Sequence, residues 1–176
     1  MLRTTSLRAA AGLLAGLAAL GSGTARADVK LPAIFGDHMV LQRDLKVHVW
    51  GWAEPGEDVK VEFHGQARTT KADGDGAWSV SLEPVAAGGP FEMVVTGKNT
   101  LTFKDVLVGE VWVCSGQSNM QWSVGSSTHA DLEIAAANYP NIRLISVPQV
   151  GTQEPQKDFK GEWKPCSPQT VGPFSA

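Results

Sequence analysis

The sequence is poor in cysteine, has no excess of positive charge, and lacks an apolar run long enough to cross a bilayer. Two of its 176 residues are cysteine, Cys114 and Cys166. They allow one disulfide, and the sequence alone does not show whether the two lie close together. Acidic side chains outnumber basic ones by 18 to 15, and no basic stripe is present. Nucleic acid is therefore not an expected partner, because phosphate binding needs a concentration of positive charge.

The first 27 residues predict a secretory signal peptide. Arg3 and Arg8 precede a 12-residue apolar run at 9–20, and the cleavage-site pattern Ala25-Arg26-Ala27 follows. A helix that spans a bilayer needs about 20 apolar residues, so a permanent membrane anchor is disfavoured. Cleavage after residue 27 removes three arginines and no acids, which leaves 12 basic and 18 acidic side chains and a formal charge of −6. We expect a secreted or periplasmic protein with no membrane attachment after cleavage.

Residues 28–105 predict an antiparallel β-sandwich domain. Short segments in which apolar and polar residues alternate are separated by clusters of Gly, Pro and Asp. Alternation at period two is typical of half-buried strands, and those clusters favour turns. The expected strands are 47–49, 59–63, 78–82, 91–96 and 101–103.

The pattern changes at residue 106, which predicts the beginning of an α/β domain over 106–176. Residues 106–114 are almost continuously apolar, as in a strand that is covered on both faces of a parallel sheet. A helix is expected over 132–137 after capping-box spacing at Thr128–Asp131, and a second apolar strand over 142–147. The segment from Pro148 onward has scattered prolines and predicts irregular surface structure.

Ser118 follows the apolar run directly, among small and polar residues. A serine in a sharp turn at the carboxyl end of a strand can present its hydroxyl where open α/β sheets bind ligands. The free backbone N–H groups of such a turn can stabilise the oxyanion that forms when serine attacks an ester. Ser118 is thus the candidate nucleophile, with its own amide as one oxyanion donor. Spacing alone also fits an ordinary polar turn, and Met120 departs from the Gly-x-Ser-x-Gly pattern of α/β-hydrolases.

The stretch around Ser118, residues 109–122 (GEVWVCSGQSNMQW), resembles the signature of the sialate O-acetylesterase family, part of the SGNH/GDSL hydrolase superfamily. The resemblance extends over nearly the whole chain after residue 27. Further similar stretches are 35–43 (FGDHMVLQR), 49–53 (VWGWA), 75–78 (DGAW), 161–168 (GEWKPCSP) and 174–176 (FSA).

This resemblance implies a β-sandwich joined to a flavodoxin-like SGNH hydrolase domain, of which residues 106–176 are the N-terminal part. It implies that Ser118 is the nucleophile and that an Asp-x-x-His motif supplies the base. No Asp-x-x-His occurs in the 176 residues. We therefore expect an N-terminal portion of a longer enzyme that is catalytically incomplete by itself, because a serine without its base is a poor nucleophile.

Other residues near Ser118 have supporting or structural roles in this interpretation. Gly116, Gln117 and Asn119 are expected to shape the turn and support the oxyanion site, and Trp122 is a candidate for the substrate rim. Cys114 is expected to be structural. His38 and His129 are weak candidates for a base, while His48 and His64 are expected to face solvent. Neither a metal nor a cofactor is required.

The predicted function is that of a carbohydrate O-acetylesterase that acts through an acyl-serine intermediate. Its expected substrate is O-acetylated sialic acid, which makes it a sialate O-acetylesterase, and the sequence does not separate sialic acid from the acetylated sugars of a polysaccharide. The alternative is a non-catalytic carbohydrate-binding or structural module in which the β-sandwich is the working part.

Overall fold

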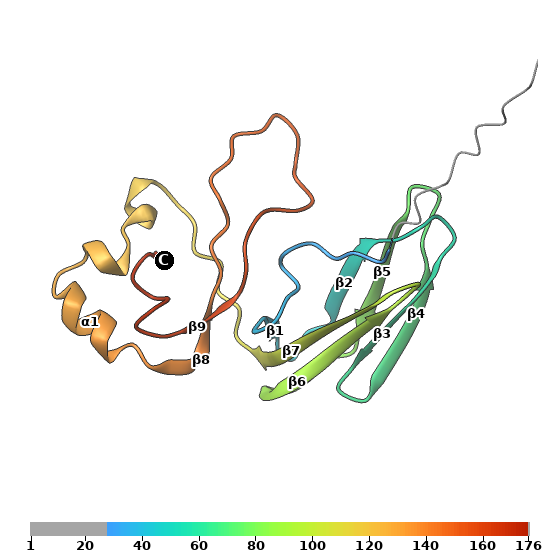
Figure 1. The fold of residues 1–176 in the computed structure, drawn as a ribbon, viewed down its shortest axis with the longest axis horizontal. Helices are drawn as coiled ribbons and strands as arrows, with labels where there is room; N and C mark the ends of the chain where they lie inside the picture. The colour runs from blue at the N-terminus through green and yellow to red at the C-terminus, as the bar shows by residue number, and fades with distance from the viewer. Residues whose placement is uncertain (1–27, 176) are drawn as a thin grey trace, which may run out of the picture.

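The computed structural model describes residues 28–175, and most of their regular structure is β-strand. The predicted signal peptide lies outside these described residues. The first part contains seven strands: β1 (Val40–Gln42), β2 (Val47–Trp52), β3 (Asp58–Phe63), β4 (Gln66–Lys71), β5 (Ala77–Leu82), β6 (Gly88–Thr96) and β7 (Thr100–Gly109). The second part contains the 3-10 helices η1 (Ser118–Gln121) and η2 (Val124–Ser126), the helix α1 (Ala130–Ala136) and the strands β8 (Tyr139–Leu144) and β9 (Lys164–Cys166). Figure 1 shows the two parts side by side, with the sheets at one end and α1 at the other.

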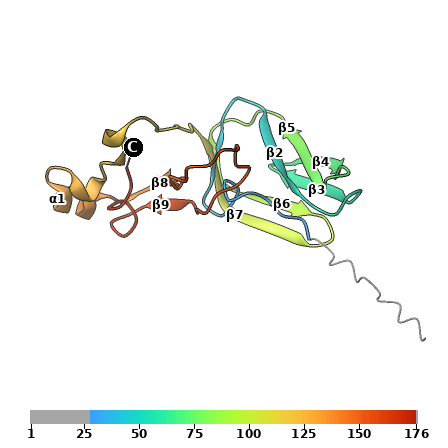
Figure 2. The ribbon, with the colours of Figure 1, turned by 90° about the horizontal axis from the view of Figure 1, so that it is seen from above.

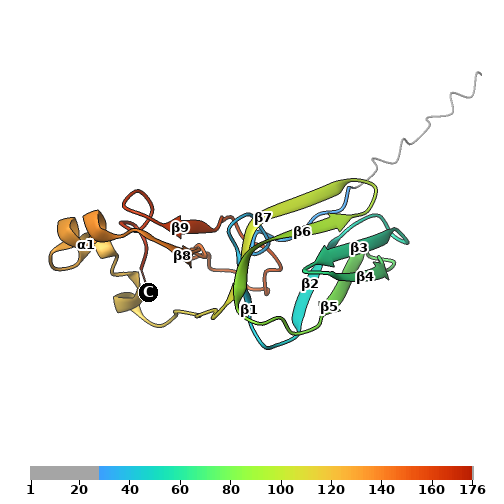
Figure 3. The ribbon, with the colours of Figure 1, turned by 90° about the horizontal axis from the view of Figure 1, so that it is seen from below.

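The seven N-terminal strands form two sheets. One has five strands in the order β1-β7-β6-β3-β4, and the other is the β2-β5 pair. In Figure 3, β2 and β5 lie across from β6 and β7. The expected mixed β structure is confirmed. One pairing departs from the antiparallel pattern, because β1 runs parallel to β7.

Both sheets contribute side chains to one hydrophobic core. The burial of β3 and β5 alternates residue by residue, as the period-two pattern of the sequence predicts. Fully buried side chains come from both layers and include Val49, Val61, Leu82, Met93 and Val106. The tight β3–β4 connection has only two residues, His64 and Gly65, and both have positive φ angles (46° and 74°). This is the backbone geometry of the two-residue hairpin turns that match the natural twist of strands.

The second part has a small core of its own. Ala137, Leu144, Cys166 and Val171 are buried together, with Val124, Ile134 and Phe174 packed against them. Figure 2 shows β8 and β9 between α1 and the sheets. Backbone bonds from Val124 to Phe174 (3.0 Å) and from Gly125 to Gly172 (2.8 Å) hold η2 against the C-terminal segment.

The strand expected over residues 106–114 ends at residue 109, and it belongs to the N-terminal sheet and not to a new parallel sheet. β7 runs through residue 105 and ends at Gly109, so residues 106–109 belong to the N-terminal sheet. It therefore continues four residues beyond the boundary expected between residues 105 and 106. Residues 110–114 are extended but pair with no described strand. An apolar sequence can form a buried strand only where neighbouring strands are present to receive its backbone hydrogen bonds.

The remaining elements of the second part are confirmed in kind but differ in detail. The helix is present, but its N-cap is His129 in the left-handed region (φ 57°) without a side-chain capping bond, so the expected capping box does not form. The second strand, β8, begins at Tyr139 and runs antiparallel to β9. Within residues 28–175 the second part therefore has no parallel strand pair.

The segment between β8 and β9 is irregular, as predicted, but it returns to the N-terminal core. The expectation of irregular structure from Pro148 onward is wrong at Lys164–Cys166, which form β9. Figure 1 shows the segment as a long orange-to-red loop. Trp163 is buried in the core of the sheets, and its indole N–H donates to the carbonyl of Ile34 (2.8 Å). Asp158 accepts a hydrogen bond from the amide of Ala33 (2.8 Å). The loop thus ties the two parts together.

Candidate functional site

Ser118 follows the extended segment 110–117, which continues from the C-terminal end of β7, an inner strand between β1 and β6. Apolar side chains along this segment face solvent, with exposed fractions of 38% for Val111, 83% for Trp112 and 91% for Val113. Exposed apolar side chains in a row are unusual on a soluble protein and favour contact with another surface.

The beginning of this segment is fixed by polar contacts from the end of β1 and the loop after it. Glu110 accepts hydrogen bonds from Arg43 Nε (2.7 Å) and Gln42 Nε2 (2.9 Å). The amide of Val111 donates to Gln42 Oε1 (2.9 Å). The two hydrogen bonds, that from Gln42 foremost, lower the pKa of Glu110 below its usual range. The direction in which the chain leaves β7 is therefore set by neighbouring side chains.

The turn at Ser118 is a single turn of 3-10 helix closed by backbone bonds. The amide of Met120 donates to the carbonyl of Gln117 (2.9 Å), and that of Trp122 donates to the carbonyl of Asn119 (3.2 Å). The side chains of Gln117 and Asn119 are exposed and make no hydrogen bond within residues 28–175. Their backbone, rather than their side chains, shapes the turn.

The hydroxyl of Ser118 is exposed and makes no hydrogen bond to any described residue. The amides of Ser118 and Asn119 likewise donate to no group in the described part of the chain. A serine that is both accessible and flanked by unused N–H groups has two of the features that acyl transfer needs.

Gly116 makes room for the side chain of Met120 beneath this turn. A Cβ atom at residue 116 would lie 2.7 Å from Cγ of Met120, closer than real Cβ contacts allow. Any larger residue there would displace Met120 and, with it, the residues that follow Ser118. The absence of a side chain at Gly116 thus allows Met120 to pack close to the backbone before Ser118.

Trp122 and Gln121 hold the far side of the turn. The indole N–H of Trp122 donates to the carbonyl of Ser126 (2.8 Å), while 63% of the side chain remains exposed. Gln121 Nε2 donates to Gln149 Oε1 (2.6 Å) in the long loop. The ring of Trp122 is therefore available at the surface four residues after Ser118.

None of the four histidines forms a hydrogen bond with Ser118. His48 on β2 and His64 in the β3–β4 turn are exposed to solvent, as predicted, and His129 is the exposed N-cap of α1. His38 is engaged elsewhere, with Nδ1 2.6 Å from Asp105 Oδ2. Residues 28–175 thus present the candidate nucleophile without a base, and they hold no cluster of three His, Cys, Asp or Glu suited to a metal ion.

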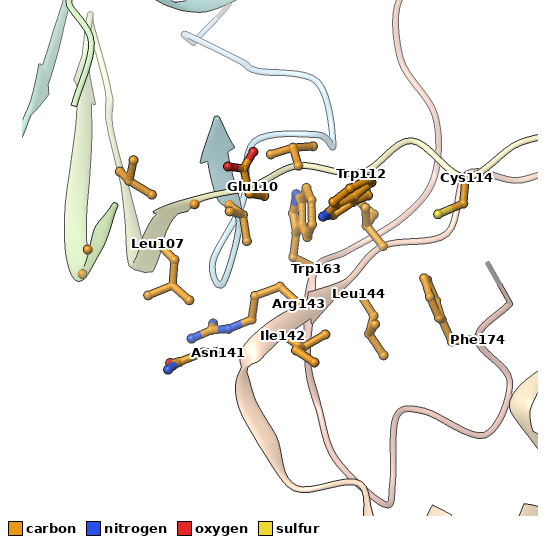
Figure 4. Close-up of a pocket in the computed structure, with 17 residues that line it drawn as sticks. Leu107, Glu110, Trp112, Cys114, Asn141, Ile142, Arg143, Leu144, Trp163 and Phe174 are labelled. Atoms are coloured by element: carbon orange, nitrogen blue, oxygen red, sulfur yellow. The ribbon is translucent and has the colours of Figure 1, made fainter. Parts of the chain in front are cut away.

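A pocket of about 650 Å³ lies beside the extended segment, between it and β8. Figure 4 shows Trp112, Cys114, Trp163 and Leu144 among its mainly apolar lining, with Arg143 and Glu110 as charged members. Ser118 is not among the lining residues; the segment contributes only as far as Cys114. Among the described residues, this pocket and the candidate nucleophile are therefore separate features.

A cluster of Asp105, Arg143 and His38 joins the two parts of the chain, and the sequence did not predict it. Arg143 Nη1 and Nη2 donate to the two carboxylate oxygens of Asp105 at 2.7 and 3.1 Å. Hydrogen bonding from Arg143, followed by that from His38, lowers the pKa of Asp105 to about 2. A usable signal was present, because Asp105 and Arg143 are charged residues that interrupt or border apolar runs.

Cys114 and Cys166 are both free thiols, so the disulfide left open by the sequence does not form. Cys114 is exposed on the extended segment, so the expectation of a structural cysteine in a buried strand is wrong, whereas Cys166 is buried in the second core. Among the described residues there is also no helix with the length and apolarity needed to cross a bilayer.

Comparison with known proteins identifies the family. Sialate O-acetylesterase from Mus musculus is 36% identical over 136 residues, which cover 70% of this chain and 25% of the relative. The human sialate O-acetylesterase is 33% identical over 151 residues, or 76% of this chain and 29% of the relative. The chain belongs to the sialate O-acetylesterase family. The resemblance found in the sequence is thereby confirmed, although no family model matches the chain.

A solved structure agrees with this membership. The crystal structure of a carbohydrate acetylesterase from Xanthomonas citri matches with a TM-score of 0.81 at 41% identity. The match covers 84% of this chain and 35% of that protein. The chain thus spans between a quarter and three tenths of the length of the two sialate O-acetylesterases and about a third of the solved acetylesterase.

Proposed function

We propose that this chain belongs to an exported carbohydrate O-acetylesterase in which Ser118 is the nucleophile. The observation that carries the proposal is the exposed, unbonded hydroxyl of Ser118, in a turn whose sequence resembles the signature of the family. The relatives are acetylesterases, which supports ester hydrolysis as the chemistry.

In the proposed reaction, Ser118 Oγ attacks the acetyl carbonyl carbon and its proton passes to a base. The sugar hydroxyl then leaves with that proton, and an acetyl-serine remains. Water attacks the acetyl-serine, acetate is released and Ser118 regains its proton. The unused amide of Ser118 is suited to stabilise the negative charge on the carbonyl oxygen in both steps.

The proposal requires a proton acceptor from outside residues 1–176. The sequence contains no Asp-x-x-His, and the one histidine with an acidic partner, His38, has it in Asp105 on the N-terminal sheet. The chain alone is therefore expected to be inactive. The same additional polypeptide would supply the strands of the flavodoxin-like sheet that the exposed segment 111–113 is suited to join.

The proposed substrate is an O-acetylated sugar, with sialic acid as the first candidate. Two relatives carry the name sialate O-acetylesterase, while the solved relative is named only as a carbohydrate acetylesterase. Acetylated sialic acid and acetylated xylan therefore need to be compared as substrates. Residues 1–27, with their basic start and short apolar run, support export to the periplasm or the medium.

The nucleophile is tested in the complete product of the open reading frame that contains these residues. Ser118→Ala is expected to lower the hydrolysis of p-nitrophenyl acetate by about 10⁴-fold or more, by analogy with serine proteases. Ser115→Ala is the matched control, because Ser115 is an exposed serine on the same segment. Activity that survives Ser118→Ala, or that is lost equally in Ser115→Ala, would contradict the assignment.

A non-catalytic carbohydrate-binding or structural module is the second candidate, supported by the hydrophobic core that the two N-terminal sheets build between them. The gene sequence downstream of codon 176 distinguishes the two functions. An Asp-x-x-His in a continued reading frame supports the esterase. A stop codon there, together with binding of acetylated sugar by residues 28–176, supports the module.

A further inference from the structure

We propose that Asp105 is a positioning residue that fixes the Ser118-bearing part of the chain against the N-terminal sheets by holding Arg143. The inference rests on the proposed function of Ser118 for its catalytic consequence, but the geometry stands without it. Asp105 lies in β7, whereas Arg143 lies in β8, beside the second core.

Most hydrogen bonds of the Arg143 guanidinium go to Asp105. Its side chain is only 4% exposed, and its guanidinium makes a two-pronged contact with the Asp105 carboxylate. Its Nε donates to the carbonyl of Pro140 (2.7 Å), which fixes the guanidinium to its own strand. A buried guanidinium with one carboxylate partner is held in direction as well as in distance, because the planar fork matches the two oxygens.

Asp105 is held from the other side by the segment before β1. His38 Nδ1 lies 2.6 Å from Asp105 Oδ2, and the ionised carboxylate can only accept, so His38 donates. The amide of His38 donates to the carbonyl of Lys104 (3.0 Å), and the amide of Lys104 donates to Asp37 Oδ1 (2.7 Å). The carboxylate thus accepts from both parts of the molecule at once.

The backbone at both ends of the His38–Asp105 contact adopts a conformation that side chains disfavour. The φ angles are 66° at His38 and 55° at Asp105, both in the left-handed region. Such angles persist where the surroundings enforce them, and they cluster at sites with a specific task. The two residues with these φ angles, His38 and Asp105, are the ones whose side chains form the hydrogen bond.

The Asp105–Arg143 contact is connected to Ser118 both along the chain and through the second core. The chain from Asp105 reaches Ser118 through the last strand residues and the extended segment 110–117, which pairs with no described strand. The turn is held at its other end by η2, whose Val124 packs in the same small core as Leu144, the neighbour of Arg143. Releasing Arg143 would therefore let that core, and the turn attached to it, move relative to the sheets.

The first experiment measures the arrangement directly in the 176-residue chain. Spin labels are placed on Cys residues that replace exposed Thr69 of β4 and exposed Glu133 of α1, in a Cys114→Ser background. We expect one narrow distance distribution in the parent and in Asp58→Asn, which breaks the exposed Asp58–Lys71 pair (2.8 Å). Asp105→Asn and Arg143→Lys are expected to broaden or shift it, since lysine lacks the fork. Unchanged distributions in both variants would overturn the proposal.

A double variant distinguishes a change in the arrangement of the two parts from a loss of stability. Asp105→Asn alone leaves a buried cation unpaired, which can destabilise the chain. Asp105→Asn/Arg143→Gln removes both charges and leaves no unpaired ion. We expect it to fold cooperatively and still give the broadened distribution; a folded double variant with the parent's narrow distribution contradicts the positioning role.

The second experiment measures the catalytic consequence in the complete reading-frame product. Active serines are counted by labelling with a fluorophosphonate, and kcat is expressed per labelled serine. We expect the double variant to lower kcat per labelled serine at least tenfold with a smaller change in KM, because misplacement by about 1 Å can cost 10²-fold. A purely structural role would lower the number of labelled serines and leave kcat per serine unchanged, which overturns the positioning of the site.

The outcomes separate this inference from the proposed function. If Ser118→Ala retains full activity, the nucleophile assignment fails, while the distance measurement still decides whether Asp105 fixes the arrangement. If Ser118→Ala is inactive and the distances do not change in the Asp105 and Arg143 variants, the proposed function stands and this inference fails.

Discussion

The indole N–H of Trp163 donates a hydrogen bond to the carbonyl of Ile34, 129 residues earlier in the chain. The same ring is 9% exposed and packs in the core of the N-terminal sheets. A residue near the C-terminal end of the sequence is therefore part of the first folding unit.

Replacing Trp163 is expected to destabilise the N-terminal sheets. Trp163→Phe removes the donor and leaves the Ile34 carbonyl unpaired, at about 1–2 kcal/mol in the free energy of unfolding. Trp163→Ala also leaves a cavity and is expected to cost about 3–5 kcal/mol. Urea unfolding followed by circular dichroism measures both. Trp112→Phe is the control, since 83% of Trp112 is exposed, and a loss as large as that of Trp163→Phe would contradict the assignment.

Gly51 is expected to be intolerant of any side chain. A Cβ there would collide with the carbonyl oxygen of Lys30 and lie 2.9 Å from the ring of Trp78. Gly51→Ala must therefore disrupt the backbone pairing of Lys30 with Trp52 (2.7 and 2.8 Å), at about 1–3 kcal/mol or more. Gly74→Ala, where a Cβ meets nothing within 4 Å, is expected to change stability by less than about 1 kcal/mol. Equal thermal midpoints for the two variants would contradict this packing.

The two thiols are expected to differ sharply in reactivity. Cys114 is exposed and Cys166 is buried, and they are not bonded to each other. Ellman's reagent should therefore titrate one thiol in the folded chain and two after unfolding in guanidinium. Cys114→Ser should abolish the reaction of the folded chain. A chain purified under oxidising conditions that shows no thiol even when unfolded would mean that a disulfide forms after all.

Asp105 is expected to contribute to acid sensitivity between about pH 4 and pH 2. Its pKa falls from 3.8 to about 2 in the folded chain, so the folded state binds this proton less readily than the unfolded state. Its stabilising contribution is complete above the unfolded pKa and is lost as the pH falls through the folded one. The advantage of the parent over Asp105→Asn in the free energy of unfolding should shrink across that window. An advantage that is constant from pH 6 to pH 2 would show that the carboxylate charge plays no part.

The sequence predicted the features that depend on local pattern. Alternating apolar residues and turn clusters located five of the seven N-terminal strands but not β1 and β4, and Ser118 lies in a turn, where the sequence placed it. The prediction of a strand over Val106–Cys114 was partly wrong, because an apolar sequence indicates that a segment is buried but not which strands cover it. The first residues of this stretch are covered by the N-terminal sheet, and its last residues have no described strand beside them. Trp163 and the Asp105–Arg143 contact were missed because they join residues far apart in sequence. Charged residues beside apolar runs mark Asp105 and Arg143 as unusual, but a single sequence does not show which residue each of them contacts.

The parallel pairing of β1 with β7 has a consequence for the order in which the chain can fold. Val40 meets its partner Leu107 only after 67 further residues have been made. Because synthesis begins at the N-terminus, β1 has no partner strand while β2 to β6 are being made. Contacts between such distant residues form slowly, because a long loop must close before they are gained. β1 can thus join the five-stranded sheet only after residues 107–109 have been made, and in a chain interrupted before residue 107 it would have no strand to pair with.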